Sequence, residues 1–140
     1  MNIRIRVAAA ADAPALFELN ALFDNDTTLE LLQRSLTENE REVVCIAELD
    51  GVAMGFCTAL IMRSMCYAEP RADIEALYVK LEARRRGVAA ALLRHTEEIF
   101  AAQGVRHFHV NTSSANVAAL ALYKRLGYAE AGELLLDKSV

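Results

Sequence analysis

The junction between a short apolar segment and an alanine-rich one, near residue 87, most constrains what this chain can fold into. Residues 73–79 have the composition of a buried strand, and from Gly87 to about Gln103 apolar residues recur at helical spacing. A basic turn, Arg84-Arg85-Arg86, joins the two segments. A strand that passes directly into a helix favours an α/β fold, in which helices cover the faces of a sheet.

The same periodicities extend over the whole chain. They predict strands at residues 3–7, 43–49, 52–65, 73–79, 105–111 and 134–138. They predict helices at residues 12–23, 27–36, 87–103 and 116–126, with Asp12, Thr27 or Thr28, and Asn116 as N-caps. Asp50-Gly51 marks a tight hairpin. The order β-α-α-β-β-β-α-β-α-β predicts a mixed, mostly antiparallel sheet flanked by helices, in one domain spanning residues 1–140.

Composition and charge exclude several classes of protein. The net charge of −4 is not that of a nucleic-acid binder, and no apolar run approaches the ~20 residues of a membrane span. The alternating N-terminus lacks the long apolar core of a signal peptide. Cys45, Cys57 and Cys66 form no C-x-x-C pair, and the histidines lack zinc spacing. We therefore expect a cytoplasmic protein with free thiols, no bound metal, and no nucleic-acid or membrane partner.

The basic turn before the long helix has the features of an anion site. The first amides of a helix have no partner within it, and with the helix dipole they favour a negative charge. Gly87 lets the backbone approach a phosphate closely, because glycine has no Cβ. Arginines at this end of a helix oppose the dipole unless an anion is bound, and their guanidinium groups suit phosphates. The alternative is a solvated basic turn ahead of an ordinary helix.

Two motifs resemble those of the GNAT superfamily of acetyl-CoA-dependent N-acetyltransferases. The family's loop, Arg/Gln-x-x-Gly-x-Gly/Ala, matches Arg84-x-x-Gly87-x-Ala89. A second motif matches Asn116, Ala119 and the run Leu122-Tyr123-Lys124-Arg125-Leu126-Gly127-Tyr128. The resemblance is specific over residues 73–128, and it departs from many members at Ala89, where they have glycine.

The resemblance implies how acetyl-CoA, the co-substrate, would bind. Backbone groups of the strand before the loop would pair with the pantetheine arm, and amides of the loop would hold the pyrophosphate. Asn116 would contact the pantetheine or phosphate arm. The implied cofactor-binding residues are Leu77, Tyr78, Val79, Arg84, Arg85, Arg86, Gly87, Val88, Ala89, Ala90, Asn116, Ala119 and Tyr123. Family members are often dimers, so the resemblance also implies a homodimer.

Tyr123 and Glu75 are the candidate catalytic residues. Amine acetylation requires a neutral amine and a protonated leaving thiolate. Tyr123 lies seven residues after Asn116 on the same predicted helix face, and the resemblance places it near the cofactor sulfur as a general acid. The alternative is a core aromatic. Glu75, a carboxylate on a mostly apolar strand, is either the general base or an anchor for a cationic substrate.

The acceptor site is the least determined part of the sequence. Asp24 and Asp26 follow the first predicted helix, where the family's acceptor site begins, and Tyr67 lies in the loop before the fourth strand. Each is a candidate substrate-binding residue, or else an ordinary polar loop or surface residue. The predicted activity is transfer of acetyl to a primary amine by direct attack, and a small-molecule amine is favoured. The alternatives are a protein N-terminal or lysine acetyltransferase and a non-catalytic CoA-binding regulatory module.

Overall fold

The computed structural model describes residues 2–23 and 26–140, and in these residues five strands form one sheet in the order β1-β2-β3-β4-β5. The strands are β1 (Ile3–Val7), β2 (Glu42–Leu49), β3 (Val52–Met62), β4 (Arg71–Val79) and β5 (His107–Val110). Neighbours are antiparallel except β4 and β5, which are parallel. The mixed, mostly antiparallel sheet is therefore confirmed, and so is the hairpin turn, since Asp50 and Gly51 both have positive φ.

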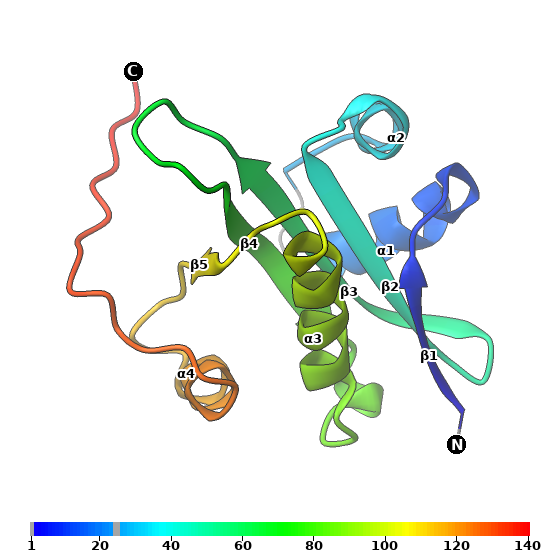
Figure 1. Cartoon of the computed structure of the whole chain (residues 1–140). Helices are drawn as coiled ribbons and strands as arrows, with labels where there is room; N and C mark the ends of the chain where they lie inside the picture. Colours follow the sequence, from blue (N-terminus) through cyan, green and yellow to red (C-terminus); the bar gives the residue numbers. More distant parts are fainter. Residues whose placement is uncertain (1, 24–25) are drawn as a thin grey trace.

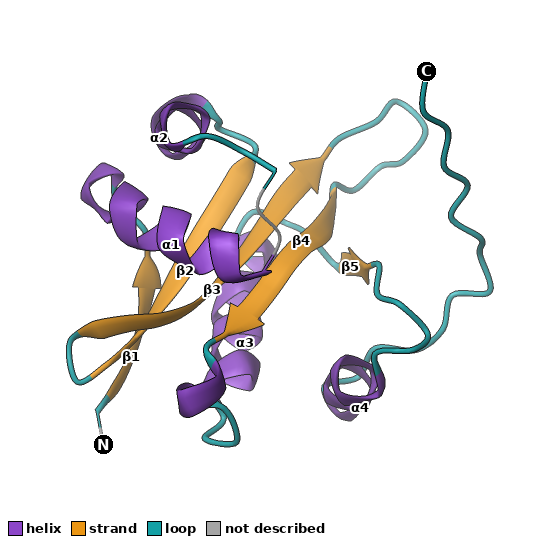
Figure 2. Cartoon of the chain, turned by 180° about the vertical axis from the view of Figure 1, so that it is seen from behind, coloured by secondary structure: helices purple, strands orange, loops and turns teal. Residues whose placement is uncertain are grey.

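Helices cover both faces of this sheet. They are α1 (Ala13–Phe23), α2 (Leu29–Glu38), α3 (Val88–Ala101) and α4 (Val117–Arg125), with 3-10 turns η1 (Ala10–Asp12) and η2 (Leu81–Ala83). Figure 1 shows α3 on one face, and the reverse view in Figure 2 shows α1 and α2 on the other. α4 lies to the side, beyond β5 (Figure 1). Within the described ranges, no helix has the length and apolar character needed to cross a membrane.

Each face has its own core. The larger one packs Leu92, Leu93 and Phe100 of α3 against residues such as Cys45 and Cys57 of the sheet. The smaller one, on the opposite face, packs Leu16 and Leu19 of α1 against Ile46 and Phe56. Burial of apolar side chains on both faces is the main stabilising contribution in such a layered fold.

Two of the predicted helix caps are confirmed and one is wrong. Thr28 accepts a hydrogen bond from the Leu31 amide, and Asn116 accepts one from Ala119. Asp12 does not cap α1, because both of its carboxylate oxygens bind the Arg6 guanidinium, at 2.7 and 2.8 Å. This ion pair holds the pKa of Asp12 below its usual range and ties the start of α1 to β1.

The predicted last strand at residues 134–138 is also wrong for the chain taken alone. In the structure the segment after α4 has no regular secondary structure, although its composition suits a strand. A strand forms by pairing with a neighbouring edge, and no described strand pairs with this segment.

One extra residue in β4 changes which of its side chains face each side of the sheet. Thr58 of β3 lies opposite Ala76, and Ala59 lies opposite Ile74, so Glu75 is a β-bulge without a partner on β3. Before the bulge Ile74 packs in the larger core, and after it Leu77 and Val79 do. Ala76 and Tyr78 accordingly face the smaller core.

Gly55 allows β3 and β4 to approach closely beside this segment. A Cβ at this position would lie 2.7 Å from the Tyr78 carbonyl oxygen and 3.2 Å from the Val79 Cγ2 atom. We expect Gly55→Ala to lower the free energy of unfolding by about 1–3 kcal/mol, because the Tyr78–Val79 backbone must shift. Urea denaturation measures this loss. Gly51→Ala, with a strained backbone but nothing near its Cβ, is the control, and equal losses in both variants would contradict the close contact.

Candidate active site

β4 and β5 separate halfway along β4. They pair over Arg71–Ile74 and His107–Val110, and among the described strands none pairs with residues 75–79 on the β5 side. Backbone groups of the segment 77–79 that face this edge are therefore available to a ligand that binds like an added strand, except the Val79 carbonyl oxygen, which accepts from Arg84. The sequence predicted this role for these three residues.

The loop that follows is fixed against the end of β4. The Arg84 Nε donates to the Val79 carbonyl oxygen at 2.8 Å, and the Lys80 amide donates to Met54 at 2.8 Å. Ala83 is fully buried. Arg84, predicted as a phosphate ligand, thus also positions the loop, which gives the following residues a defined conformation.

The backbone before α3 has the conformation of an anion-binding turn. Arg85 and Gly87 both have left-handed backbones, with φ of 64° and 78°, and such residues turn successive amides toward one side. The first hydrogen bond of the helix runs from the Ala91 amide to the Gly87 carbonyl, so the amides before Ala91 have no partner within the helix. Gly87 stands at the N-cap position and has no side chain that could cap this end. A Cβ at Gly87 would meet no atom within 4 Å, which leaves space for an anion above the amides.

Tyr123 of α4 belongs to the larger core, to which the open half of β4 also contributes side chains. It is 8% exposed and packs in the larger core with Leu77, Val79 and Ala119. Burial, with a smaller contribution from Cys57, raises the pKa of Tyr123 to about 12, so the phenol is protonated at neutral pH. Its hydroxyl bonds to no described residue, yet it keeps contact with solvent. These are the properties of an available proton donor.

Tyr128 has a different environment although it touches Tyr123. The two rings meet edge to face with centroids 5.6 Å apart. The Tyr128 hydroxyl donates to Glu97 at 2.6 Å, and burial together with this bond raises its pKa. Tyr128 is therefore committed to a structural hydrogen bond. Asn116 likewise uses its side-chain oxygen as the cap of α4.

Glu75 stands where β5 leaves β4. Partial burial, and then the charges of Asp73 and Glu42, raise the pKa of its carboxyl above the usual range. The bulge leaves it unpaired with β3 and exposed. A raised pKa at an accessible carboxylate suits proton transfer, and the surrounding negative charge suits a cationic substrate.

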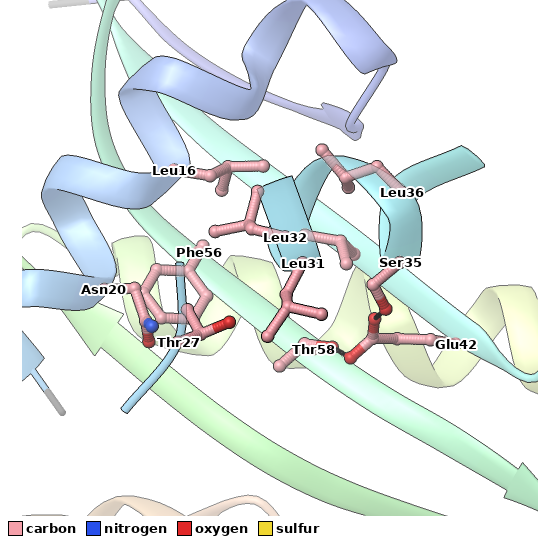
Figure 3. A pocket seen from close by; sticks show the side chains of 11 residues that line it. Leu16, Asn20, Thr27, Leu31, Leu32, Ser35, Leu36, Glu42, Phe56 and Thr58 are labelled. Carbon is pink, nitrogen blue, oxygen red and sulfur yellow. Dashed lines mark hydrogen bonds between the residues drawn. The ribbon is translucent and has the colours of Figure 1, made fainter. Parts of the chain in front are cut away.

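A cavity of about 210 Å³ lies on the side of the sheet covered by α1 and α2. Its lining is largely apolar, and Figure 3 shows the Glu42 carboxylate between Ser35 and Thr58. The hydroxyls of Ser35 and Thr58 donate to Glu42 at 2.5 and 2.7 Å. Thr58 borders the bulge at Glu75, and the charge of Glu42 contributes to the raised pKa of the Glu75 carboxyl, so Glu75 lies near this hydrogen-bonded group.

The sequence did not identify this cavity. The groups around Glu42 come from α2, β2 and β3, and no local motif links them. The one sequence feature that could have indicated this cavity is a charged residue at the start of a strand. Asp26 and Tyr67 are exposed, and neither lines the cavity. The Arg71 guanidinium stacks over the Tyr67 ring at 3.6 Å. Asp24 lies outside the described residues.

Two of the three cysteines, Cys45 and Cys57, have the character of core residues, whereas Cys66 is exposed. Cys45 and Cys57 face each other across β2 and β3, and both are fully buried. Burial raises the pKa of Cys57 to about 12, so its nucleophilic thiolate is disfavoured. His109 lies 3.6 Å from Asp73, but within residues 2–23 and 26–140 no group of three metal-ligating side chains gathers.

Comparison with known proteins identifies the class that this fold and site define. The acetyltransferase (GNAT) family model matches residues 12–128, and the chain belongs to this family. Human N-acetyltransferase 8 is 26% identical over 107 residues, which are 76% of this chain and 47% of that protein. The aminoglycoside N(6')-acetyltransferase type 1 of Salmonella typhimurium is 32% identical over 88 residues, 61% of each chain. The chain thus spans about half to three fifths of these relatives.

Solved structures share the whole fold. AAC(6')-Iy in complex with a bisubstrate analogue has a TM-score of 0.88 and 22% identity, and covers 100% of this chain and 99% of its own. An aminoglycoside acetyltransferase from an uncultured soil sample, in complex with sisomicin, has a TM-score of 0.86 and 21% identity, over 99% and 96%. A ribosomal-protein-alanine N-acetyltransferase from Brucella melitensis has a TM-score of 0.84 and 16% identity, over 99% and 100%. The fold alone therefore does not distinguish acceptors.

Proposed function

We propose that this chain is an acetyl-CoA-dependent N-acetyltransferase that transfers acetyl to a primary amine by direct attack in a ternary complex. One observation carries the proposal. The unpaired edge of β4 leads directly to the uncapped start of α3, where the position above Gly87 is open. An extended amide-containing arm that ends in a diphosphate fits this combination.

The donor side is built from backbone. The edge at Leu77–Val79 would hold the pantetheine amides, and the amides of residues 85–90 would hold the pyrophosphate. The exposed guanidinium of Arg85 adds positive charge at the same end of α3. Bound acetyl-CoA supplies the acetyl group as an activated thioester.

Two side chains, Glu75 and Tyr123, transfer the protons in this proposal. Glu75 accepts a proton from the acceptor ammonium, directly or through water, so that the nitrogen can attack. As the C–N bond forms and the C–S bond breaks, the Tyr123 hydroxyl donates its proton to the departing sulfur, and the acylated nitrogen loses its second proton to solvent to give the neutral amide. Both groups regain their starting states by proton exchange with solvent. The raised pKa values of both residues support these roles.

A small amine with several positive charges is the acceptor that the site favours. The cavity beneath α1 and α2 is small, and the charges of Asp73 and Glu42 act on the Glu75 carboxyl, so three carboxylates lie in this region. The similarity to aminoglycoside N-acetyltransferases supports the same class. A protein N-terminus or lysine is the alternative acceptor, favoured by the likeness to a ribosomal-protein-alanine N-acetyltransferase. A CoA-binding regulatory module is the non-catalytic alternative.

Release of free CoA thiol tests these choices. The panel contains sisomicin, a linear polyamine, an N-terminal alanine peptide and a lysine peptide, each with acetyl-CoA. We expect turnover with the small cationic amines; turnover with peptides alone would favour the alternative acceptor.

Acetyl-CoA at 100 times its Kd should add about 2.7 kcal/mol to the free energy of unfolding. Binding without thiol release on any amine would indicate a regulatory module, and no binding would refute the proposal.

Glu75→Gln separates the base and anchor roles. We expect kcat/KM for the amine to fall about tenfold or more. In the wild type, kcat/KM should rise with pH as Glu75 ionises, at a pH above the usual carboxyl range because its pKa is raised. That rise should disappear in the variant. A change in KM alone would assign Glu75 as an anchor. A carboxyl group with a raised pKa in the folded protein contributes to stability at low pH, and this contribution is lost as the pH rises through that pKa. At pH 7 the ionised Glu75 therefore disfavours the fold, and the variant, which lacks this charge, should have a higher Tm. Glu38→Gln, on exposed α2 surface, is the control.

Two expectations from the sequence remain part of the proposal. The first is a cytoplasmic location, supported by the odd number of cysteines. The second is a homodimer, supported by the family resemblance and by the exposed leucines near the C-terminus.

A further inference from the structure

The Glu42 carboxylate in the wall of the cavity under α2 has hydroxyl partners but no cationic one. Each of its oxygens accepts one hydrogen bond, from Ser35 at 2.5 Å and from Thr58 at 2.7 Å. The Ser35 oxygen accepts from Asn39 at 3.3 Å, so its own proton is directed to Glu42. A carboxylate has roughly four acceptor positions, which leaves roughly two of them open here. In the described part of the chain, no lysine or arginine forms a salt bridge with Glu42.

The rest of the cavity wall is mainly apolar. Its apolar side chains come from α1, α2, β2 and β3, and they are Leu16, Leu31, Leu32, Leu36, Val44 and Phe56. Figure 3 shows the Glu42 carboxylate toward one end of this group of side chains, with Asn20 and Thr27 toward the other. Leu31 lines the cavity and is still 54% exposed, and α2 has no buried residue. The wall therefore offers apolar surface that a ligand can cover.

A single residue connects this wall to the candidate base. Thr58, whose hydroxyl binds Glu42, lies opposite Ala76, the residue that follows Glu75 in β4. Only β3 separates β2 from β4, and two strand spacings place these two backbones roughly 10 Å apart. After partial burial and the charge of Asp73, the charge of Glu42 is the third cause of the raised pKa of Glu75. One small molecule can therefore reach both Glu42 and Glu75.

We propose that Glu42 is a second cation-binding group of the acceptor site, and that the acceptor is a diamine whose amino groups are joined by an apolar chain. The proposal rests on the proposed function and names the substrate class of that site. One amino group reaches Glu75 and is acetylated, the chain covers the apolar wall at Leu31, and the second ammonium pairs with Glu42. An ammonium has three donors and no acceptor, which suits a carboxylate with open acceptor positions. A body rich in hydroxyls fits less well, because the apolar wall offers it few partners.

Binding of 1,6-diaminohexane and of hexylamine to the complex with CoA tests this proposal. The two amines have the same chain, and only the diamine has a second ammonium. We expect the wild type to bind the diamine about tenfold more tightly, since hexylamine lacks a hydrogen bond between charged groups. Glu42→Gln should bind the two amines about equally. Glu38→Gln, which removes a carboxylate from the exposed surface of α2, should behave as the wild type. Isothermal titration measures all of these affinities.

Two further variants separate the charge of Glu42 from its contact with α2. Ser35→Ala removes the hydrogen bond between α2 and Glu42 but keeps the carboxylate, so the preference for the diamine should remain. Leu31→Lys brings an ammonium of the protein into the same cavity from an exposed position, so the preference should be lost. Because Leu31 is exposed, this variant decides even if Glu42→Gln misfolds.

The opposite results overturn the proposal. They are equal binding of both amines by the wild type, or a preference that survives in Glu42→Gln or in Leu31→Lys. If Ser35→Ala lost the preference as fully as Glu42→Gln, Glu42 would serve only to hold α2 in place. Thiol release from acetyl-CoA with either amine tests the transferase separately. Release without a diamine preference refutes the role of Glu42 and leaves the proposed function intact, and a diamine preference in binding without release on any amine does the reverse.

Discussion

Replacing Gly87 by valine should weaken acetyl-CoA binding by about 10- to 100-fold, the loss expected when a phosphate can no longer approach one or two backbone amides. The protein itself leaves room for the new side chain, since no atom lies within 4 Å of the Cβ position. The space that valine fills is therefore the space assigned to the phosphate. Isothermal titration with acetyl-CoA measures the change.

The left-handed backbone of Gly87 makes a matched control necessary. A β-branched residue at φ +78° is strained, and that strain alone lowers stability. Gly104, just past the other end of α3, has φ +89° and is equally open. Gly104→Val should lose similar stability and bind acetyl-CoA normally. Equal affinities in the two variants would rule out the phosphate site at Gly87.

Tyr123→Phe should lower kcat by about 100-fold and leave acetyl-CoA affinity nearly unchanged, since the ring is kept and the donated proton is lost. Phenylalanine preserves the packing against Leu77 and Ala119. Because the pKa of Tyr123 is raised to about 12, ionisation of this residue should not lower the kcat of the wild type at any pH below 11. Single-turnover kinetics across pH 6–10 isolate the chemical step.

Tyr128→Phe is the control for this experiment. It removes the hydroxyl of the neighbouring, partly buried tyrosine that donates to Glu97, and we expect a loss of stability with kcat little affected. If Tyr128→Phe slowed the chemical step as much as Tyr123→Phe, the acid assignment would be wrong. If neither variant changed kcat, protonation of the thiolate by solvent would be sufficient.

The sequence predicted the elements whose stability is local. The spacing around α3, the Asp50-Gly51 turn and the caps at Thr28 and Asn116 depend on residues a few positions apart, and the structure has them. Asp12 was misassigned because its partner, Arg6, lies on another element. The last strand was misassigned because composition shows that a segment suits a strand but not where its partner edge lies.

The candidate site divides in the same way. The donor side consists of a strand end, a turn and a helix start that are contiguous in sequence, so a motif of a few residues predicts it. The acceptor side is assembled from α1, α2, β2 and β3, and the Glu42 network joins residues that are 7 and 16 positions apart. Such contacts depend on the register of the sheet, which the sequence pattern does not specify.

The bulge at Glu75 has a consequence for how this enzyme fold can diverge. Because the inserted residue shifts the alternation, Ala76 and Tyr78 face the layer of α1 and α2, while Leu77 and Val79 face the layer of α3. Under the proposed function, substitutions at Ala76 and Tyr78 would therefore alter the side of the sheet that receives the amine, and would leave the side chains that pack under α3 unchanged.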